Sequence, residues 1–133
     1  MTSEVIYQGG LRTISVHLNS NNQIVTDAPI DNHGKGEAFS PTDMVANSLA
    51  TCMMTVMGIK AIDLNVDIEQ SKANVTKVMG PDPRRIIKII IDFEMIGALT
   101  KKDQTILERT AQTCPVMYSL HPDIEKEISF KWI

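Results

Sequence analysis

The segment SPTDMVANSLATCMMTVMG, residues 40–58, decides the fold, because it predicts a long helix at the centre of the molecule. Ser40 suits the N-cap position, Pro41 suits the first helical position, and Asp43 completes a capping-box-like pair with Ser40. Apolar or small residues occupy nearly every side of this helix, so we expect it to be buried on most of its circumference. Its charge-free part, residues 44–59, falls short of the ~20 predominantly apolar residues that span a bilayer. We therefore predict a core helix and no membrane partner.

Patterns typical of strands flank this helix on both sides. Residues 85–96 are the clearest case, because every second residue from Ile87 to Met95 is apolar and these side chains share one face. Gly9 and Gly10 predict a hairpin turn between the first two strands. The other expected strands are 5–7, 11–18, 23–26, 66–79 and the last residues around 128–132, and further helices are expected after Thr100 and from Pro115 to Leu120. This order of elements predicts the α+β fold class.

Length and composition exclude several classes of protein. The chain has 133 residues, 43% of them hydrophobic and 22% charged, which is typical of one globular domain over residues 1–133. The net charge is −3 and no basic run is present, so we expect no nucleic acid partner. The first residues carry an acidic Glu4 and lack the pattern of a signal peptide, so we expect a cytoplasmic protein.

Few residues are candidates for chemistry. The cysteines and histidines are scattered without the close spacing of a zinc site, and no phosphate-binding glycine loop is present, so we expect no metal and no cofactor. Arg12 lies just past the Gly9-Gly10 turn, in a strand where it shares a face with Ile14 and Val16. An arginine on an apolar face requires a partner.

The two cysteines allow more than one interpretation. Two cysteines in a cytosolic chain are most often small buried side chains, and a structural disulfide is disfavoured there. Cys52 lies about 18 Å along the helix from its N-cap, too far for the helix dipole to lower its pKa, so it would need a nearby cation. Cys114 precedes Pro115 and stands where a helix N-terminus could stabilise a thiolate. Helix geometry alone would favour Cys114 as the nucleophile or leave the choice open.

Taken together, several motifs resemble those of the OsmC/Ohr superfamily. They are the run GEAFSPTDMVA at residues 36–46 leading to Cys52, the later Cys114-Pro115-Val116, the N-terminal hairpin with Arg12, and the Pro-Arg-Arg-Ile segment at residues 83–86. The resemblance covers nearly the whole chain. It implies an OsmC-like α+β fold with antiparallel sheets around a long buried central helix, and an intertwined homodimer with its sites at the subunit interface.

The resemblance also implies a thiol peroxidase that reduces organic hydroperoxides. Cys52 matches the family's peroxidatic position, Cys114 the resolving position, and Arg12 the arginine that holds the thiolate and binds the peroxide oxygens. An external dithiol would reset the resulting disulfide, and the resemblance suggests a dithiol of the lipoyl type. Where some family members have a glutamate that pairs with the arginine, this chain has Thr42, and Glu37 in the preceding loop is the substitute candidate.

A second hypothesis comes from the many methionines near the cysteines. It describes a non-catalytic dimer that binds a small apolar ligand, with both cysteines inert in the core. The two hypotheses differ in the reactivity that they predict for Cys52.

Overall fold

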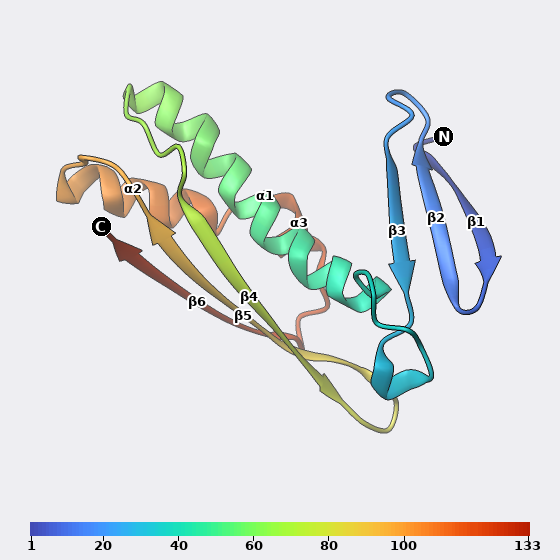
Figure 1. Cartoon of the computed structure of the whole chain (residues 1–133). Coiled ribbons are helices and arrows are strands. Elements are labelled where there is room, and N and C mark those ends of the chain that lie inside the picture. The colour runs from blue at the N-terminus through green and yellow to red at the C-terminus, as the bar shows by residue number, and fades with distance from the viewer. The chain divides into compact units, whose positions relative to one another are not determined.

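Helix α1 (Pro41–Leu64) is the longest element of the computed structural model, which describes all 133 residues of the chain (Figure 1). Its predicted capping box is confirmed. The backbone N–H of Asp43 donates to Ser40 Oγ at 3.0 Å, and the backbone N–H of Ser40 donates to Asp43 Oδ2 at 3.0 Å. The helix ends at Leu64, because Asn65 adopts a left-handed conformation with a φ of 55°.

The burial of α1 differs from the expectation. Six of its 24 residues are buried, and they form a single stripe at helical spacing: Ala46, Leu49, Ala50, Met53, Met57 and Ala61. On other sides Ile59 is 59% exposed and Ile62 is 79% exposed. The prediction of burial on most of the circumference is therefore wrong for the single chain, because one sheet covers only one side of a helix.

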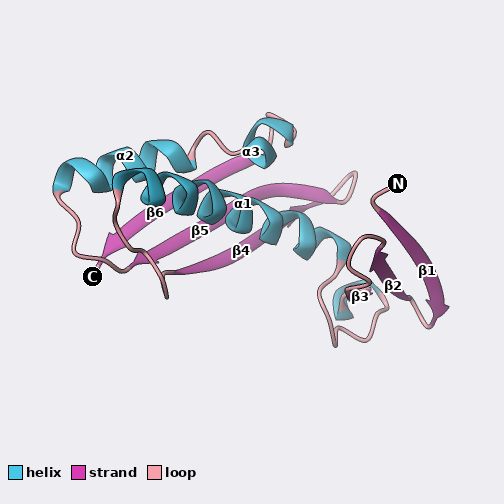
Figure 2. Ribbon diagram, turned by 90° about the horizontal axis from the view of Figure 1, so that it is seen from above, coloured by secondary structure: helices cyan, strands magenta, loops and turns pink.

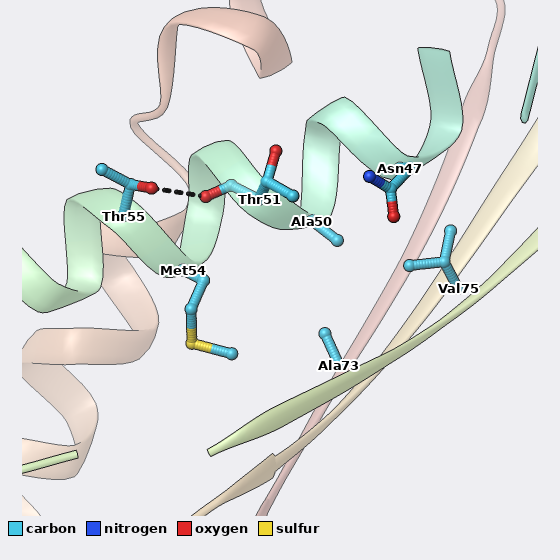
Figure 3. Close-up of a pocket in the computed structure, with 7 residues that line it drawn as sticks. All are labelled: Asn47, Ala50, Thr51, Met54, Thr55, Ala73 and Val75. Atoms are coloured by element: carbon cyan, nitrogen blue, oxygen red, sulfur yellow. Dashed lines mark hydrogen bonds between the residues drawn. The ribbon is translucent and has the colours of Figure 1, made fainter. Parts of the chain in front are cut away.

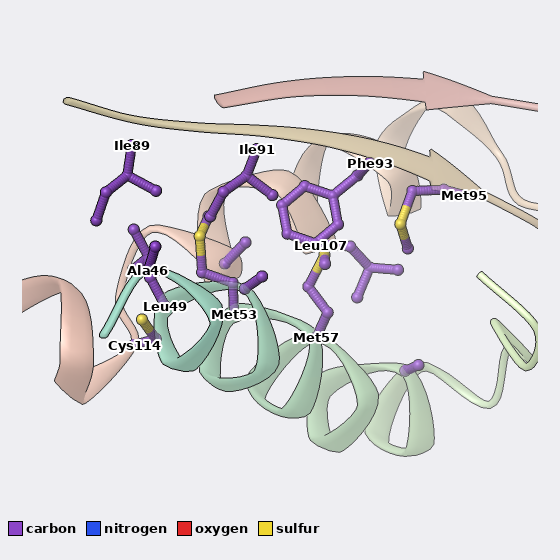
Figure 4. Close-up of a cluster of buried hydrophobic side chains, with 13 residues drawn as sticks. Ala46, Leu49, Met53, Met57, Ile89, Ile91, Phe93, Met95, Leu107 and Cys114 are labelled. Atoms are coloured by element: carbon purple, nitrogen blue, oxygen red, sulfur yellow. The ribbon is translucent and has the colours of Figure 1, made fainter. Parts of the chain in front are cut away.

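The length of α1 also corrects the argument from its charge-free stretch. The helix has 24 residues and a mean hydropathy of 1.4 over its most apolar window, so by length and composition alone it could cross a membrane. A core helix of a globular protein passes the same test. The buried stripe of α1 faces the apolar side of a strand, as a core helix does (Figure 4).

The chain divides into two compact units, Met1–Val45 and Ala46–Ile133. The prediction that residues 1–133 act as one domain stays a prediction. The first unit contains an antiparallel sheet with the order β1-β2-β3 and, in the following loop, the short 3-10 helix η1 (Ile30–Asn32). Its strands are β1 (Ser3–Gly9), β2 (Arg12–His17) and β3 (Gln23–Asp27). Gly9 and Gly10 both have positive φ in the first turn, as the hairpin prediction requires.

The second unit contains a sheet with the order β4-β5-β6, covered on one face by helices (Figure 2). Its elements after α1 are β4 (Lys72–Gly80), β5 (Arg85–Met95), α2 (Lys101–Ala111), α3 (Pro115–Ser119) and β6 (Glu125–Trp132). β4 pairs with β5 antiparallel, whereas β6 pairs with β5 in parallel. The expected α+β fold is confirmed, and its sheets are antiparallel except at β6. The chain passes through α2 and α3 before it returns as β6, and such a crossover connects parallel strands.

β4 is shorter than the strand predicted over residues 66–79. The carboxylate of Asp67 accepts a hydrogen bond from the backbone N–H of Glu69 at 2.8 Å, and Gln70 has a φ of 68°. This local turn competes with extended backbone, so pairing with β5 begins only at Lys72.

The core of the second unit lies between α1, α2 and the apolar face of β5 (Figure 4). The predicted apolar face of β5 is confirmed from Ile89 to Met95, since Ile89, Ile91, Phe93 and Met95 are all buried, whereas Ile87 is 37% exposed. Phe93 stacks on Phe130 of β6 with ring centroids 4.9 Å apart. This packing fixes the side of α1 that faces the sheet and thereby the side on which Cys52 lies.

Candidate functional site

The two cysteines meet in the second unit. Cys52 lies on α1 and is partly buried, whereas Cys114 is fully buried at 0% exposure. The two side chains are near enough for Cys52 to raise the pKa of the Cys114 thiol. Both cysteines are free thiols in this structure. The arrangement brings together the two residues that the sequence singled out from positions 62 residues apart.

Cys114 is held at the junction of two helices, as predicted. It is the N-cap of α3, with extended backbone, and its Sγ accepts a hydrogen bond from the backbone N–H of Met117 at 3.3 Å. Pro115 occupies the first helical position, which explains why α2 does not continue through Cys114.

The electrostatics of Cys114 oppose the choice that helix geometry alone favours. Burial is the largest effect and raises the pKa of the Cys114 thiol, although the Met117 N–H works in the other direction. The hydrogen bond and charge of Cys52 raise it further. Cys114 is therefore kept as a protonated thiol, and the more exposed Cys52 is the better placed of the two to act as a nucleophile.

Arg12 lies in the first unit and has two acidic partners there. Its Nε donates to Asp27 Oδ1 at 2.7 Å and its Nη2 donates to Asp27 Oδ2 at 2.8 Å. The same Nη2 donates to Glu37 Oε2 at 3.1 Å. Glu37 is thus a partner of Arg12, as the sequence suggested, but the two-point contact is made by Asp27. Thr42 supplies no carboxylate, and its hydroxyl lies 3.2 Å from the hydroxyl of Ser40.

The ion pairs shift the pKa values of both groups in the expected directions. The hydrogen bond from Arg12 is the largest effect on Asp27 and lowers the pKa of its carboxyl, against the opposing effect of burial. The hydrogen bonds to Asp27 and then Glu37 raise the pKa of Arg12. Both groups are therefore charged at neutral pH.

Sequence reasoning missed Asp27 because it placed this residue in the loop after the strand. In the structure Asp27 is the last residue of β3 and stands directly opposite Arg12 in the register of β2 and β3. If the predicted strand 23–26 had been extended by one residue, the pairing of Asp27 with Arg12 could have been predicted, since cross-strand neighbours of opposite charge attract.

A separate pocket of about 370 Å³ lies between α1 and β4 (Figure 3). It is lined by Asn47, Ala50, Thr51, Met54, Thr55, Ala73 and Val75. Cys52 is two positions from both Ala50 and Met54, and at ~100° per residue its side chain points away from this pocket. The pocket is therefore distinct from the thiol pair.

Comparisons with known proteins agree on one family. Residues 34–129 match the family model described as OsmC-like protein. No curated protein matches the sequence. A solved structure from Psychrobacter arcticus, named for osmotic stress induction and a detoxification response, is 54% identical, with a TM-score of 0.95 and coverage of 98% of this chain and 96% of that one.

Two more distant solved structures share the fold. An organic hydroperoxide resistance protein OsmC from Legionella pneumophila is 16% identical, with a TM-score of 0.71 and coverage of 98% of this chain and 97% of that one. An organic hydroperoxide resistance protein from Elizabethkingia anophelis is 13% identical, with a TM-score of 0.76 and coverage of 100% and 97%. With the match of the family model over most of its length and a relative of 54% identity, this chain belongs to the OsmC-like protein family.

Proposed function

We propose that this protein is a cysteine-based peroxidase that reduces organic hydroperoxides in defence against oxidative stress. The observation that carries the proposal is the proximity of a partly exposed Cys52 to a buried Cys114 whose pKa it raises. Solved relatives of the same fold that are named organic hydroperoxide resistance proteins support this substrate class.

The unequal surroundings of the thiols suit a two-step reaction. The Cys52 thiolate attacks one oxygen of the peroxide, the O–O bond breaks, and the alcohol leaves with a proton, which gives a sulfenic acid on Cys52. The Cys114 thiol then attacks this sulfur, releases water and leaves a Cys52–Cys114 disulfide. We propose that Arg12 binds the peroxide oxygens in this scheme, and Glu37 is its second carboxylate partner.

An external dithiol must return the disulfide to two thiols. Cys114 is buried, so the reductant reaches the disulfide from the side of Cys52. The mixed disulfide then forms on Cys52, and the second thiol of the reductant resolves it. We propose a dithiol of the lipoyl type in the cytoplasm as the reductant.

We also propose that the working unit is a homodimer. The exposed side of α1 carries Ile59 and Ile62, which are one turn apart and form an apolar patch that a second copy could cover. Sedimentation equilibrium of the purified protein tests this, and a monomer at micromolar concentration would contradict it.

The test of the proposed activity is consumption of tert-butyl hydroperoxide, cumene hydroperoxide and hydrogen peroxide with dihydrolipoamide or another dithiol as reductant. We expect turnover of the organic peroxides by the wild type and none by Cys52→Ser. Cys114→Ser is the matched control, because it removes a thiol of the same pair and is expected to stop at an oxidised Cys52. Absence of thiol loss in the wild type would overturn the proposal.

The pocket between α1 and β4 favours a second candidate, a module that binds a small apolar ligand. Alanine, valine and methionine side chains line part of it, which suits an apolar guest. This candidate predicts a co-purifying ligand in native mass spectrometry and two thiols that resist peroxide. Rapid modification of Cys52 alone would count against it.

A further inference from the structure

The two carboxylates that contact Arg12 hold its guanidinium in different ways. We propose that Asp27 is the positioning residue that fixes Arg12, and that Glu37 is an exchangeable occupant of the guanidinium edge that a two-oxygen ligand takes. The inference rests on the proposed function, since it assigns the proposed hydroperoxide to that edge.

Asp27 has the contacts of a fixed anchor. Its side chain is 0% exposed, and it accepts from Nε and Nη2 of Arg12 at 2.7 and 2.8 Å. It also accepts from the backbone N–H of Glu37 at 3.2 Å. Two parallel bonds to one edge of a guanidinium fix both its position and its plane, and burial of Asp27 keeps water from competing for them.

Glu37 has the contacts of a displaceable group. Its side chain is 66% exposed and makes one hydrogen bond to Arg12, at 3.1 Å. An exposed single contact of this kind contributes little stability, because water replaces it readily. The backbone N–H of Glu37 stays bound to Asp27 when the side chain leaves, so the exchange requires no rearrangement of the loop.

The geometry of the guanidinium defines which edge is open to a ligand. Asp27 occupies the edge formed by Nε and Nη2, and none of the hydrogen bonds of Arg12 uses Nη1. The second N–H of Nη2 points to the other edge, which Nη2 shares with Nη1. Glu37 accepts a hydrogen bond from Nη2 and so occupies the Nη2 end of this edge. A ligand with two adjacent oxygens, such as a hydroperoxide, bonds to both Nη1 and Nη2 only after it displaces Glu37.

The charges favour the same assignment. Within hydrogen-bonding range one guanidinium faces two carboxylates, and a neutral hydroperoxide that takes the place of Glu37 adds no further negative charge to the cluster. Lys35 also acts on Asp27, with the smallest of the contributing effects. Departure of the Glu37 side chain leaves a neutral Arg12–Asp27 pair whose outer edge still offers N–H donors.

Two variants with opposite expected effects test the proposal. Asp27→Asn is expected to lower kcat/KM for tert-butyl hydroperoxide at least tenfold, because the plane of Arg12 is no longer fixed. Glu37→Gln is expected to lower KM severalfold, because its neutral amide competes less well for Nη2. Glu4→Gln, which removes an exposed carboxylate from β1 of the same sheet, is the matched control. A loss in Glu37→Gln as large as that in Asp27→Asn would overturn the unequal roles, even if Asp27→Asn proves too unstable to assay.

Nuclear magnetic resonance separates this inference from the proposed activity. The chain has four arginines, so the Nε–H signal of Arg12 can be assigned with Arg12→Lys. In the inactive Cys52→Ser background the signal is expected to shift in Asp27→Asn and to stay in place in Glu37→Gln. Titration with tert-butyl hydroperoxide is expected to move the Arg12 signals at severalfold lower concentration in Glu37→Gln. No response in either background would overturn the ligand edge, whereas a response without turnover by the wild type would count against the peroxidase alone.

Discussion

Oxidation of the reduced protein by one equivalent of tert-butyl hydroperoxide is expected to join Cys52 to Cys114 and to stabilise the fold. The two thiols are neighbours in the reduced protein, near enough for Cys52 to raise the pKa of Cys114, so we expect the new bond to require little movement of α1 or α3. The product is expected to be two hydrogens lighter by intact mass, because both thiol protons leave with the products of peroxide reduction.

The magnitude follows from the separation of the cysteines along the chain. The disulfide closes a loop of about 60 residues, and the loss of chain entropy from the unfolded state corresponds to about 4 kcal/mol at 25 °C. For a chain of this length each kcal/mol raises the Tm by about 3 °C. The oxidised protein is therefore expected to melt on the order of 10 °C above the reduced protein.

Calorimetry of oxidised and reduced samples at one protein concentration measures this shift. Cys52→Ser and Cys114→Ser treated with the same peroxide are the controls and are expected to show no rise in Tm. A dithiol is expected to reverse the rise in the wild type. If the wild type loses two hydrogens and yet melts at or below the temperature of the reduced protein, the reasoning that the native fold holds the two sulfurs ready for bonding is refuted.

Further predictions concern the titratable groups and the single tryptophan. The pKa of Cys114 is raised in the folded protein, so the unfolded chain loses this proton first and stability is expected to fall above pH ~8.5; urea unfolding of Cys114→Ser should lack this part of the fall. The pKa of Asp27 is lowered on folding, so its contribution is complete above the unfolded value near ~3.9 and is lost as the pH falls through the folded value. Acid unfolding of Asp27→Asn should therefore depend less on pH, and an unchanged profile would contradict the pair. Glu108 accepts the indole N–H of Trp132 at 2.8 Å, so Glu108→Ala is expected to cost about 1 to 2 kcal/mol by tryptophan fluorescence in urea, against no measurable cost for the exposed Glu69→Ala.

Local patterns in the sequence predicted most elements, because their causes are local. The capping box at Ser40 and the alternation of β5 from Ile89 to Met95 depend on residues a few positions apart, and both are confirmed. The direction of β6 could not be predicted in this way. Alternating side chains look the same in a parallel and an antiparallel strand, and only the path of the chain between β5 and β6 decides.

For the candidate site, too, the sequence predicted the residues but not the features that depend on packing and register. Residue types and the family resemblance were sufficient to single out Cys52, Cys114 and Arg12. The order of the thiols depends on burial, which raises the pKa of Cys114, and burial is a property of the packed molecule. The main partner of Arg12 depends on the register of β2 against β3, where a difference of one residue in the end of a strand concealed Asp27.

β6 is the last strand of the chain and pairs with β5 in parallel. Cys114 lies in the segment that connects these two strands. The C-terminal end of this segment, residues 96–124, is attached to the sheet only through β6. We therefore expect the position of Cys114 against α1 to depend on β6, whose pairing with β5 joins residues distant in sequence. We expect a chain truncated before β6 to have both cysteines but to form the disulfide less readily. In that case the capacity to form the proposed disulfide would distinguish completely folded molecules from incompletely folded ones.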